Sequence, residues 1–253
     1  MADISLVIIT YNEAAHIRRC IESARGLADE VLVVDSLSVD DTVAIAESLG
    51  ARVLLQPFLG YVEQKRFAIS QATYPMVLSL DADEALSDTL YQSIAREKEE
   101  GLSKDCYSMN RLSNIGNQWI RHGGWYPDRK MRLFDKERFA VEGINPHDKF
   151  VPLPGAQTGF LRGDILHYTN SDIESRVKTI NHFSTLAAQA FHERGKKGSW
   201  IRLLTKPAFR FFIEYFLRRG FLDGFYGYVV ARTSAEYVFL RESKLIALQR
   251  RSA

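Results

Sequence analysis

Two carboxylates stand two residues apart, directly after an apolar run of the chain. Asp81 and Asp83 follow Met76–Leu80, which has the pattern of a short buried strand. Where the chain turns out of a sheet, two such side chains can share one hard cation. Mg²⁺ or Mn²⁺ bound by carboxylates keeps positions open for water and for phosphate oxygens. An Asp-x-Asp motif alone is common in surface turns, so its weight depends on its surroundings.

Two further polar clusters also follow predicted strands. Thr10–Glu13 comes after Ser5–Ile9, and Asp35–Asp41 comes after a strand that ends at Asp35. Strands that alternate with short helices indicate βαβ units and a parallel sheet. Ligands of such sheets bind beyond the carboxyl ends of the strands. We therefore expect these two clusters to converge with Asp81–Glu84.

The hydrophobic patterns predict the remaining elements. Helices are predicted over residues 14–24, 42–49, 61–72 and 87–100, and a third strand over 51–55. From Cys106 to Tyr168, short β-like runs alternate with Gly, Pro and Asn, which indicates antiparallel or mixed strands and long loops. After Ser171 the chain is predicted to be helical nearly to its end. We expect an α/β domain over residues 1–170 and a helical region over 171–253.

Other side chains near the clusters suit a nucleotide diphosphate. Asp35 can accept hydrogen bonds from a ribose or a base, or can serve as a turn residue. Lys65 and Arg66 can neutralise a diphosphate, or can be solvated helix charges. The sequence has no Gly-rich phosphate loop, no Gly-x-Gly-x-x-Gly and no Gly-x-Ser-x-Gly. These absences argue against P-loop kinases, NAD enzymes and α/β-hydrolases.

The charge of the chain is unevenly distributed. The 253 residues are 46% hydrophobic and 25% charged, with a formal net charge of +2. Residues 1–191 carry 20 basic and 26 acidic side chains, whereas residues 192–253 carry 13 and 5. The final segment therefore has a net charge of +8 and favours an anionic partner. It has no nucleic-acid recognition motif, so we expect phospholipid and no nucleic acid.

Targeting and redox features point to a cytoplasmic protein. The first apolar run lacks a basic segment before it and a small-residue cleavage site after it, so no signal peptide is expected. No apolar run is long enough to predict a spanning helix. Cys20 and Cys106 have no metal or disulfide spacing and are expected to be reduced thiols.

The basic segment contains an amphipathic pattern. One helical face would carry Phe209, Phe212, Ile213 and Phe216, and another an i, i+4 ladder of Arg210, Glu214 and Arg218. Pro207 is predicted to begin this helix and Gly220 to end it, with a second helix from about Leu222. The apolar face either packs on the rest of the protein or lies on anionic lipid.

Taken together, the clusters resemble family 2 glycosyltransferases of the GT-A fold, through Thr10–Glu13, Val33–Thr42 and Leu78–Glu84. Five more segments are similar to the bacterial lipopolysaccharide-core β-glucosyltransferase branch: Gly60–Lys65, Gly123–Phe134, Asn145–Asp148, Ile165–Tyr168 and Arg219–Gly224. The resemblance covers nearly the whole chain. It implies a Rossmann-like mixed sheet that binds a nucleotide sugar, followed by a C-terminal amphipathic helical extension.

The resemblance also implies roles for single residues. The nucleotide and its diphosphate would be bound by Thr10, Asn12, Glu13, Asp35, Lys65, Arg66 and Asp81. Asp83 would ligate Mg²⁺ or Mn²⁺, with His167 as a further ligand, and Asp148 would be the catalytic base. Arg66 stands where the family has Asn, and Asp148 is shorter than the usual Glu. Separately, Trp125 is placed to line a sugar-acceptor groove or to pack in the core.

The implied activity is an inverting transfer of a hexose, glucose from a UDP-sugar, onto a lipid-linked lipopolysaccharide core at the inner face of the cytoplasmic membrane. Such a transfer needs a base for the acceptor hydroxyl and a cation for the departing diphosphate. The alternatives are a polyprenyl-phosphate glycosyltransferase and a non-catalytic, membrane-associated nucleotide-sugar-binding protein. A nucleotidyltransferase would require a Gly-rich loop after the first strand, which the chain lacks.

Overall fold

The computed structural model describes residues 3–144, 147–169 and 172–251. The chain forms two compact units. The first, here called the sheet unit, comprises residues 1–111 and 128–168, and the second, the helical unit, comprises residues 112–127 and 169–253. The units differ from the expected domains in that residues 112–127 belong with the helices. The domain boundary at residue 170 stays a prediction.

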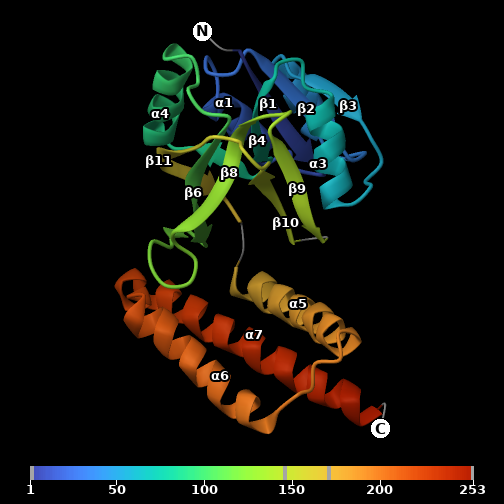
Figure 1. Ribbon diagram of the computed structural model, residues 1–253, viewed down its shortest axis with the longest axis vertical. Coiled ribbons are helices and arrows are strands. Elements are labelled where there is room, and N and C mark those ends of the chain that lie inside the picture. Colours follow the sequence, from blue (N-terminus) through green and yellow to red (C-terminus); the bar gives the residue numbers. More distant parts are fainter. Residues whose placement is uncertain (1–2, 145–146, 170–171, 252–253) are drawn as a thin grey trace. The chain divides into compact units, whose positions relative to one another are not determined.

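A mixed sheet forms the centre of the sheet unit (Figure 1). Its strands are β1 (Ile4–Thr10), β2 (Glu30–Asp35), β3 (Arg52–Leu55), β4 (Met76–Asp81), β5 (Glu84–Leu86), β6 (Cys106–Ile115), β8 (Asp128–Asp135) and β11 (Thr158–His167), in the order β3-β2-β1-β4-β8-β6-β11-β5. The strands from β3 to β4 are parallel, whereas β8 pairs antiparallel with both β4 and β6. This is the α/β class and the mixed GT-A-type sheet that the sequence predicts.

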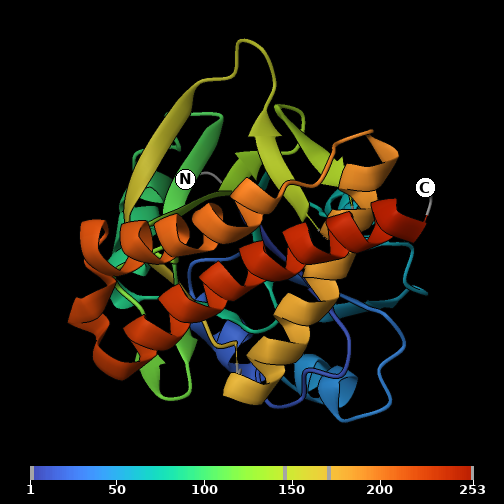
Figure 2. The ribbon, with the colours of Figure 1, turned by 90° about the horizontal axis from the view of Figure 1, so that it is seen from below.

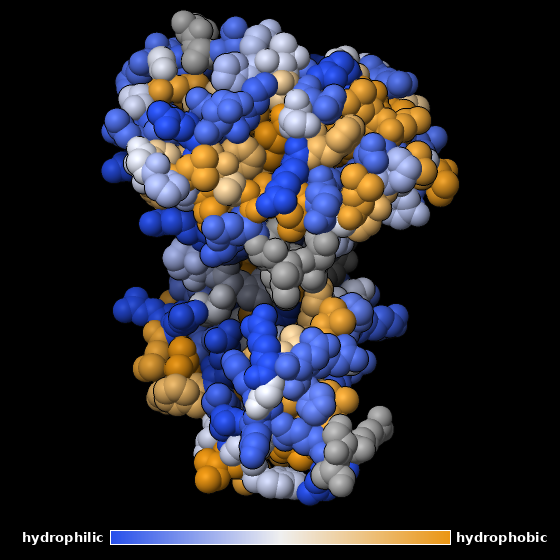
Figure 3. All heavy atoms as spheres, turned by 45° about the vertical axis from the view of Figure 1, so that its right-hand side comes forward, coloured by the Kyte–Doolittle hydropathy of each residue, from blue (hydrophilic) through white to orange (hydrophobic). Residues whose placement is uncertain are grey.

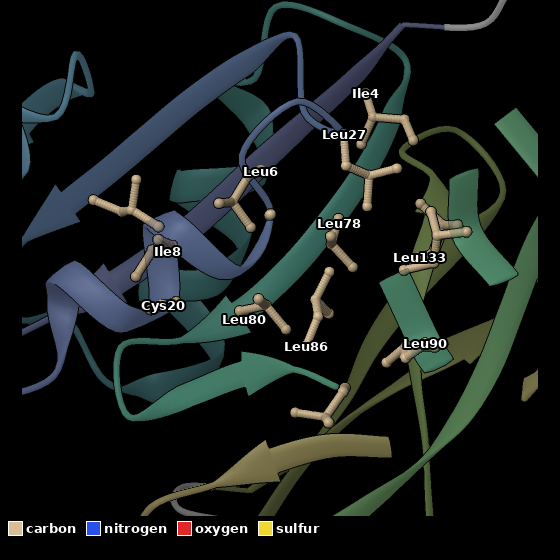
Figure 4. Close-up of a cluster of buried hydrophobic side chains, with 14 of the residues drawn as sticks. Ile4, Leu6, Ile8, Cys20, Leu27, Leu78, Leu80, Leu86, Leu90 and Leu133 are labelled. Atoms are coloured by element: carbon tan, nitrogen blue, oxygen red, sulfur yellow. The ribbon is translucent and has the colours of Figure 1, made fainter. Parts of the chain in front are cut away.

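Helices cover both faces of the sheet, because its central strands are apolar on both sides. The helices are α1 (Ile17–Ser23), α2 (Thr42–Ser48), α3 (Tyr61–Ser70) and α4 (Asp88–Glu99). Figure 4 shows Leu6 and Ile8 of β1 beside Cys20 of α1, in a cluster that α2 and α4 complete. Val7 points to the opposite face and packs with Ile69 of α3. A continuous apolar run is therefore what β1 requires.

The strand register brings the polar clusters together, as predicted. Thr10 is the partner of Asp35 across β1 and β2, and Ile9 is the partner of Asp81 across β1 and β4. The three polar clusters thus follow neighbouring strands at one edge of the sheet. Cys20 and Cys106 are buried free thiols, in agreement with the expectation from the sequence.

A separate two-stranded hairpin adjoins the sheet. It consists of β9 (Phe139–Ile144) and β10 (His147–Pro152), which pair antiparallel. Phe134 of β8 stacks on Phe139 with ring centroids 4.2 Å apart and lies 4.9 Å from Phe150 of β10. These three rings fix the hairpin against the sheet by aromatic packing.

The helical unit is built around one long helix. Its elements are β7 (Gln118–Trp119), α5 (Ile173–Glu193), α6 (Trp200–Phe212), the π-helical turn η1 (Ile213–Leu217), the 3₁₀ turn η2 (Gly220–Asp223) and α7 (Gly224–Arg251). Figure 2 shows α6 along one side of α7 and α5 on the other, and α7 contacts both. Among the described residues, no helix is long and apolar enough to cross a membrane.

One expectation about this region is wrong. Pro207 lies inside α6, because the Ser199 side chain caps the helix earlier by accepting a hydrogen bond from the Arg202 backbone N–H. The predicted i, i+4 pair of Arg210 and Glu214 is present. The Glu214 side chain is only 1% exposed and pairs with Arg210, whose Nε lies 2.6 Å from Glu214 Oε1.

Candidate active site

Asp81 lies between two cationic side chains at the end of β4. Nζ of Lys65 on α3 lies 3.3 Å from Asp81 Oδ1, and Nη2 of Arg132 on β8 lies 2.8 Å from Asp81 Oδ2. Burial alone would raise the pKa of the Asp81 carboxyl, but Arg132 and Lys65 hold it well below its usual value. Asp81 is therefore ionised, and its 30% exposed side chain can still accept hydrogen bonds from a ligand.

Beneath Asp81 lies a buried ion network that the sequence analysis missed. The Glu84 side chain is fully buried and accepts from Arg132 at 3.0 Å and from the Asp81 backbone N–H at 3.0 Å. Arg111 of β6 approaches the same carboxylate at 3.4 Å. A sequence signal was available, because Arg132 stands between Met131 and Leu133 in the apolar part of β8. A charge at such a position requires a buried partner.

Asp83 and His167 meet at the same edge of the sheet. His167 Nε2, at the end of β11, lies 3.1 Å from Asp83 Oδ2, and the Tyr168 backbone N–H donates to the Asp83 carbonyl at 2.9 Å. Their side chains are 28% and 21% exposed. The carboxylate suits Mn²⁺ or Mg²⁺, and the imidazole beside it would be the further ligand that the resemblance implies, with substrate and water oxygens completing the shell. Among the described residues, no three His, Cys, Asp or Glu side chains form a metal cluster.

The loop after β1 is tied to the loop after β2. Asn12 has a positive φ of 54°, its backbone N–H donates to Ser38 Oγ at 2.7 Å, and its side-chain oxygen accepts from Val39 at 2.9 Å. Glu13 Oε2 lies 2.7 Å from His16 Nδ1. Asn12 thus braces the site, while Glu13 keeps a half-buried carboxylate there.

Asp35 and Thr10 are buried at the last positions of β2 and β1. Asp35 is 0% exposed, and both of its oxygens accept from Ser38, one from the backbone N–H at 2.7 Å and the other from the hydroxyl. Both Asp35 oxygens are thus engaged in the turn after β2, and a role of Asp35 in nucleotide binding stays a prediction. Thr10 is 5% exposed, and its buried hydroxyl has no hydrogen-bond partner within the described part of the chain.

Three further predicted residues are Arg66, Trp125 and Asp148. Arg66 donates to the Val141 carbonyl of β9 at 2.8 Å, which ties α3 to the hairpin. Trp125 belongs to the helical unit, where the Arg176 guanidinium lies 4.5 Å from its ring centroid. Asp148 lies in β10, with its backbone paired with Gly143, and its side chain falls outside the part of the chain that is described.

Comparison with known proteins identifies the family. A family model for glycosyl transferase family 2 matches residues 5–153. The chain belongs to glycosyl transferase family 2. This confirms the resemblance inferred from the three polar clusters. The chain is a glycosyltransferase by family, and the clusters fall within the matched segment.

Several relatives match this chain over nearly its whole length. An uncharacterized glycosyltransferase of Rickettsia felis is 38% identical, with 97% of this chain and 90% of the relative covered. The lipopolysaccharide core biosynthesis glycosyltransferase LpsC of Rhizobium meliloti is 30% identical, with 96% and 91% covered. Among solved structures, Staphylococcus aureus TarS, residues 1–349, has a TM-score of 0.47 at 14% identity, with 99% of this chain and 92% of that chain covered.

The buried network of the glycosyltransferase gives a stability prediction. Arg132→Gln should lower the free energy of unfolding by about 3–5 kcal/mol, because it leaves the buried Glu84 carboxylate with the more distant Arg111. Lys130→Gln on the same strand removes only an exposed pair with Asp128 and should cost below about 1 kcal/mol. Urea denaturation measures both, and equal losses would contradict this account.

The same network predicts a dependence on pH. A carboxyl whose pKa is lowered in the folded state contributes stability above its unfolded pKa, and that contribution is lost as the pH falls through the folded pKa. The stability that the ionised Asp81 contributes should therefore be lost as the pH falls. The slope of unfolding free energy against pH should be smaller in Asp81→Asn.

Proposed function

We propose that this protein is a metal-dependent, inverting glycosyltransferase that moves glucose from a UDP-sugar onto a lipid-linked lipopolysaccharide core acceptor. The observation that carries the proposal is the Asp83–His167 pair beside the ionised Asp81, at the carboxyl ends of the strands of a family 2 chain. The lipopolysaccharide-core relative of Rhizobium meliloti supports the choice of acceptor class. The donor sugar follows from the sequence resemblance.

The donor set of the site fits a divalent cation. Asp83 and His167 would hold the ion through an oxygen and a nitrogen, and the donor diphosphate would supply further oxygens. When bound, the ion supplies charge stabilisation for the departing nucleoside diphosphate.

The chain's own residues would then bind and orient the substrates. Lys65 brings a positive charge to the edge where the diphosphate would lie, and Asp81 holds this ammonium group 3.3 Å away. Arg132 fixes Asp81 from the other side. Asp148 would take the proton of the acceptor hydroxyl as that oxygen attacks the sugar C1.

A donor screen tests the activity. Release of UDP, GDP or TDP is measured from the matching nucleotide sugars, with and without purified core lipid. We expect UDP release from UDP-glucose that rises when the core lipid is added. If no nucleotide sugar is turned over under either condition, the protein is not acting as an enzyme and the non-catalytic binding alternative is favoured. Turnover only with a polyprenyl phosphate would favour the other alternative.

We also propose that the protein acts peripherally on the inner face of the cytoplasmic membrane. Phe209, Phe212 and Phe216 are 64%, 48% and 49% exposed. Figure 3 shows hydrophobic residues directly beside strongly hydrophilic ones on the surface of the helical unit. Exposed aromatic rings beside basic side chains are typical of helices that lie in a lipid interface.

Vesicle sedimentation gives the matching prediction. Arg218→Glu/Arg219→Glu should weaken binding to anionic vesicles at least about thirtyfold, since each basic side chain near the surface contributes roughly 1 kcal/mol. Added salt should weaken binding of the unchanged protein. Arg210 is left unchanged because it pairs with the buried Glu214.

A second variant separates lipid contact from internal packing. Phe209→Ala should reduce vesicle binding while leaving the melting temperature almost unchanged, because Phe209 is mostly exposed. A large drop in melting temperature with unchanged vesicle binding would contradict the membrane proposal. So would equal binding to neutral and anionic vesicles.

A further inference from the structure

The helical unit contains a cavity of about 340 Å³ that is lined mostly by cations. Its charged lining residues are Lys196, Lys197, Arg202, Lys206, Arg241 and Glu242, so five positive charges face one carboxylate. The volume lies within the range of about 300–1,000 Å³ that is typical of small-ligand pockets. We call this cavity the basic pocket. Its residues come from the end of α5, from the connection after it, from α6 and from α7.

The single carboxylate of the basic pocket is already engaged. Glu242 is 2% exposed, and its Oε1 accepts from Arg202 Nε at 3.0 Å and from the Ser199 backbone N–H at 2.8 Å. Glu242 therefore fixes the start of α6 against α7 and neutralises Arg202. The remaining four cations have no acidic side chain in the lining to balance them.

Arg241 provides a separate sign that the basic pocket accepts an anion. Its Nε atom is buried and has no hydrogen-bond partner within the described part of the chain. The Arg241 guanidinium and the Lys196 ammonium lie 5.0 Å and 4.3 Å from the centroid of the Phe191 ring, which also lines the pocket. A buried donor without an acceptor is costly, and an anion with several oxygens would satisfy it.

The neighbouring surface indicates where such an anion comes from. Arg202 and Lys206 are four residues apart and share one side of α6. Phe209, three residues beyond Lys206 and on the same side of the helix, is 64% exposed. Free phosphate would not need an apolar surface beside its site. A lipid presents a phosphate and apolar chains together, at an interface.

We propose that the basic pocket binds the phosphate headgroup of an anionic membrane lipid while the exposed apolar side of α6 enters the lipid interface. The proposal rests on the peripheral membrane association argued above, but not on the glycosyl transfer. The proposal adds a specific binding site to the general attraction between the basic helical unit and an anionic membrane. Lys197, Lys206 and Arg241 would donate to the phosphate oxygens.

The experiment uses vesicles of phosphatidylcholine that contain either phosphatidic acid or oleate, adjusted to equal surface charge. The full-length protein should bind the phosphatidic acid vesicles at least about tenfold more tightly, because only these present a phosphate monoester to the basic pocket. Equal binding to both kinds would overturn the pocket and leave general membrane association intact. Binding to neither would overturn both. Neither result bears on nucleotide-sugar turnover, which is measured separately.

Substitutions in the basic pocket test whether the preference for phosphatidic acid arises there. Lys197→Gln/Lys206→Gln and Arg241→Gln should each abolish the preference for phosphatidic acid. The matched control Lys178→Gln/Arg232→Gln removes two exposed, salt-bridged cations of the same unit and should keep it. Equal loss in the control would overturn the proposal. Circular dichroism shows whether each variant folds. If Arg241→Gln does not fold, Lys197→Gln/Lys206→Gln still decides the test.

Competition separates the sources of phosphate. Inorganic phosphate at constant ionic strength should displace the protein from phosphatidic acid vesicles only weakly, since it lacks apolar chains. The lipid would be overturned as the occupant by a different pattern. In that pattern the protein binds inorganic phosphate or an oligonucleotide tightly, and Lys197→Gln/Lys206→Gln removes this binding without changing vesicle binding.

Discussion

Replacing Asp83 with alanine is expected to lower turnover at least about a hundredfold. This is the scale of loss when one group that stabilises developing charge is removed. Asp83 lies 3.1 Å from His167, and in the proposed mechanism the pair would give a carboxylate and an imidazole ligand to a cation at the diphosphate. Removing the carboxylate leaves one protein ligand. Turnover is measured across a titration of Mn²⁺ or Mg²⁺, with nucleotide release as the readout.

Controls separate metal binding from general damage to the site. His167→Ala should raise the metal concentration needed for half-maximal turnover, because the carboxylate remains. Asp41→Asn, an exposed carboxylate after β2, should leave turnover unchanged. If the unchanged protein and Asp83→Ala are both fully active in excess EDTA, the metal assignment is wrong.

The arrangement of the parallel strands was predictable from the sequence. Apolar runs such as Ser5–Ile9 and Met76–Leu80 are long enough for strands and too short for isolated helices. Polar residues after each run then fall at one edge, because parallel strands share their direction. The observed pairing of Thr10 with Asp35 is a direct consequence of this topology.

What the sequence could not supply is the choice among partners distant in the chain. Asp35 can bind a ribose or cap a turn, and only the position of Ser38 shows that its oxygens are engaged. Arg132 stands far from Asp81 in sequence, so their contact depends on β4 pairing antiparallel with β8. Local patterns specify which residues are polar, whereas tertiary packing decides which polar groups meet.

The tail shows a competition between two local signals. Proline is favoured in the first turn of a helix, which predicted a start at Pro207. Ser199 offers a side-chain cap earlier, and the exposed apolar residues Ile201 and Leu204 continue the same amphipathic pattern upstream. The cap and the packing of Leu203, which is 8% exposed, outweigh the preference of one proline.

Replacing Asp148 with asparagine is expected to have the largest effect on chemistry. The variant should bind the nucleotide sugar as the unchanged protein does and transfer the sugar about 10²–10⁴-fold more slowly, the contribution of a positioned general base. Calorimetry with the nucleotide sugar measures binding, and transfer to core lipid measures the chemical step. Asp148→Glu should retain substantial activity, since glutamate provides the same base.

The structure also ranks the rival carboxylates. Asp128 is held by Arg111 at 2.8 Å and by Lys130 at 3.1 Å, so two cations already engage its oxygens. Glu142 is the register partner of Lys149 across the β9–β10 hairpin. Asp128→Asn and Glu142→Gln should therefore keep near-normal transfer. If either loses transfer while Asp148→Asn keeps it, the base is another carboxylate. A polyprenyl phosphate acceptor is already ionised and needs little help from a base, so a small effect of Asp148→Asn on transfer to that acceptor would favour the alternative enzyme.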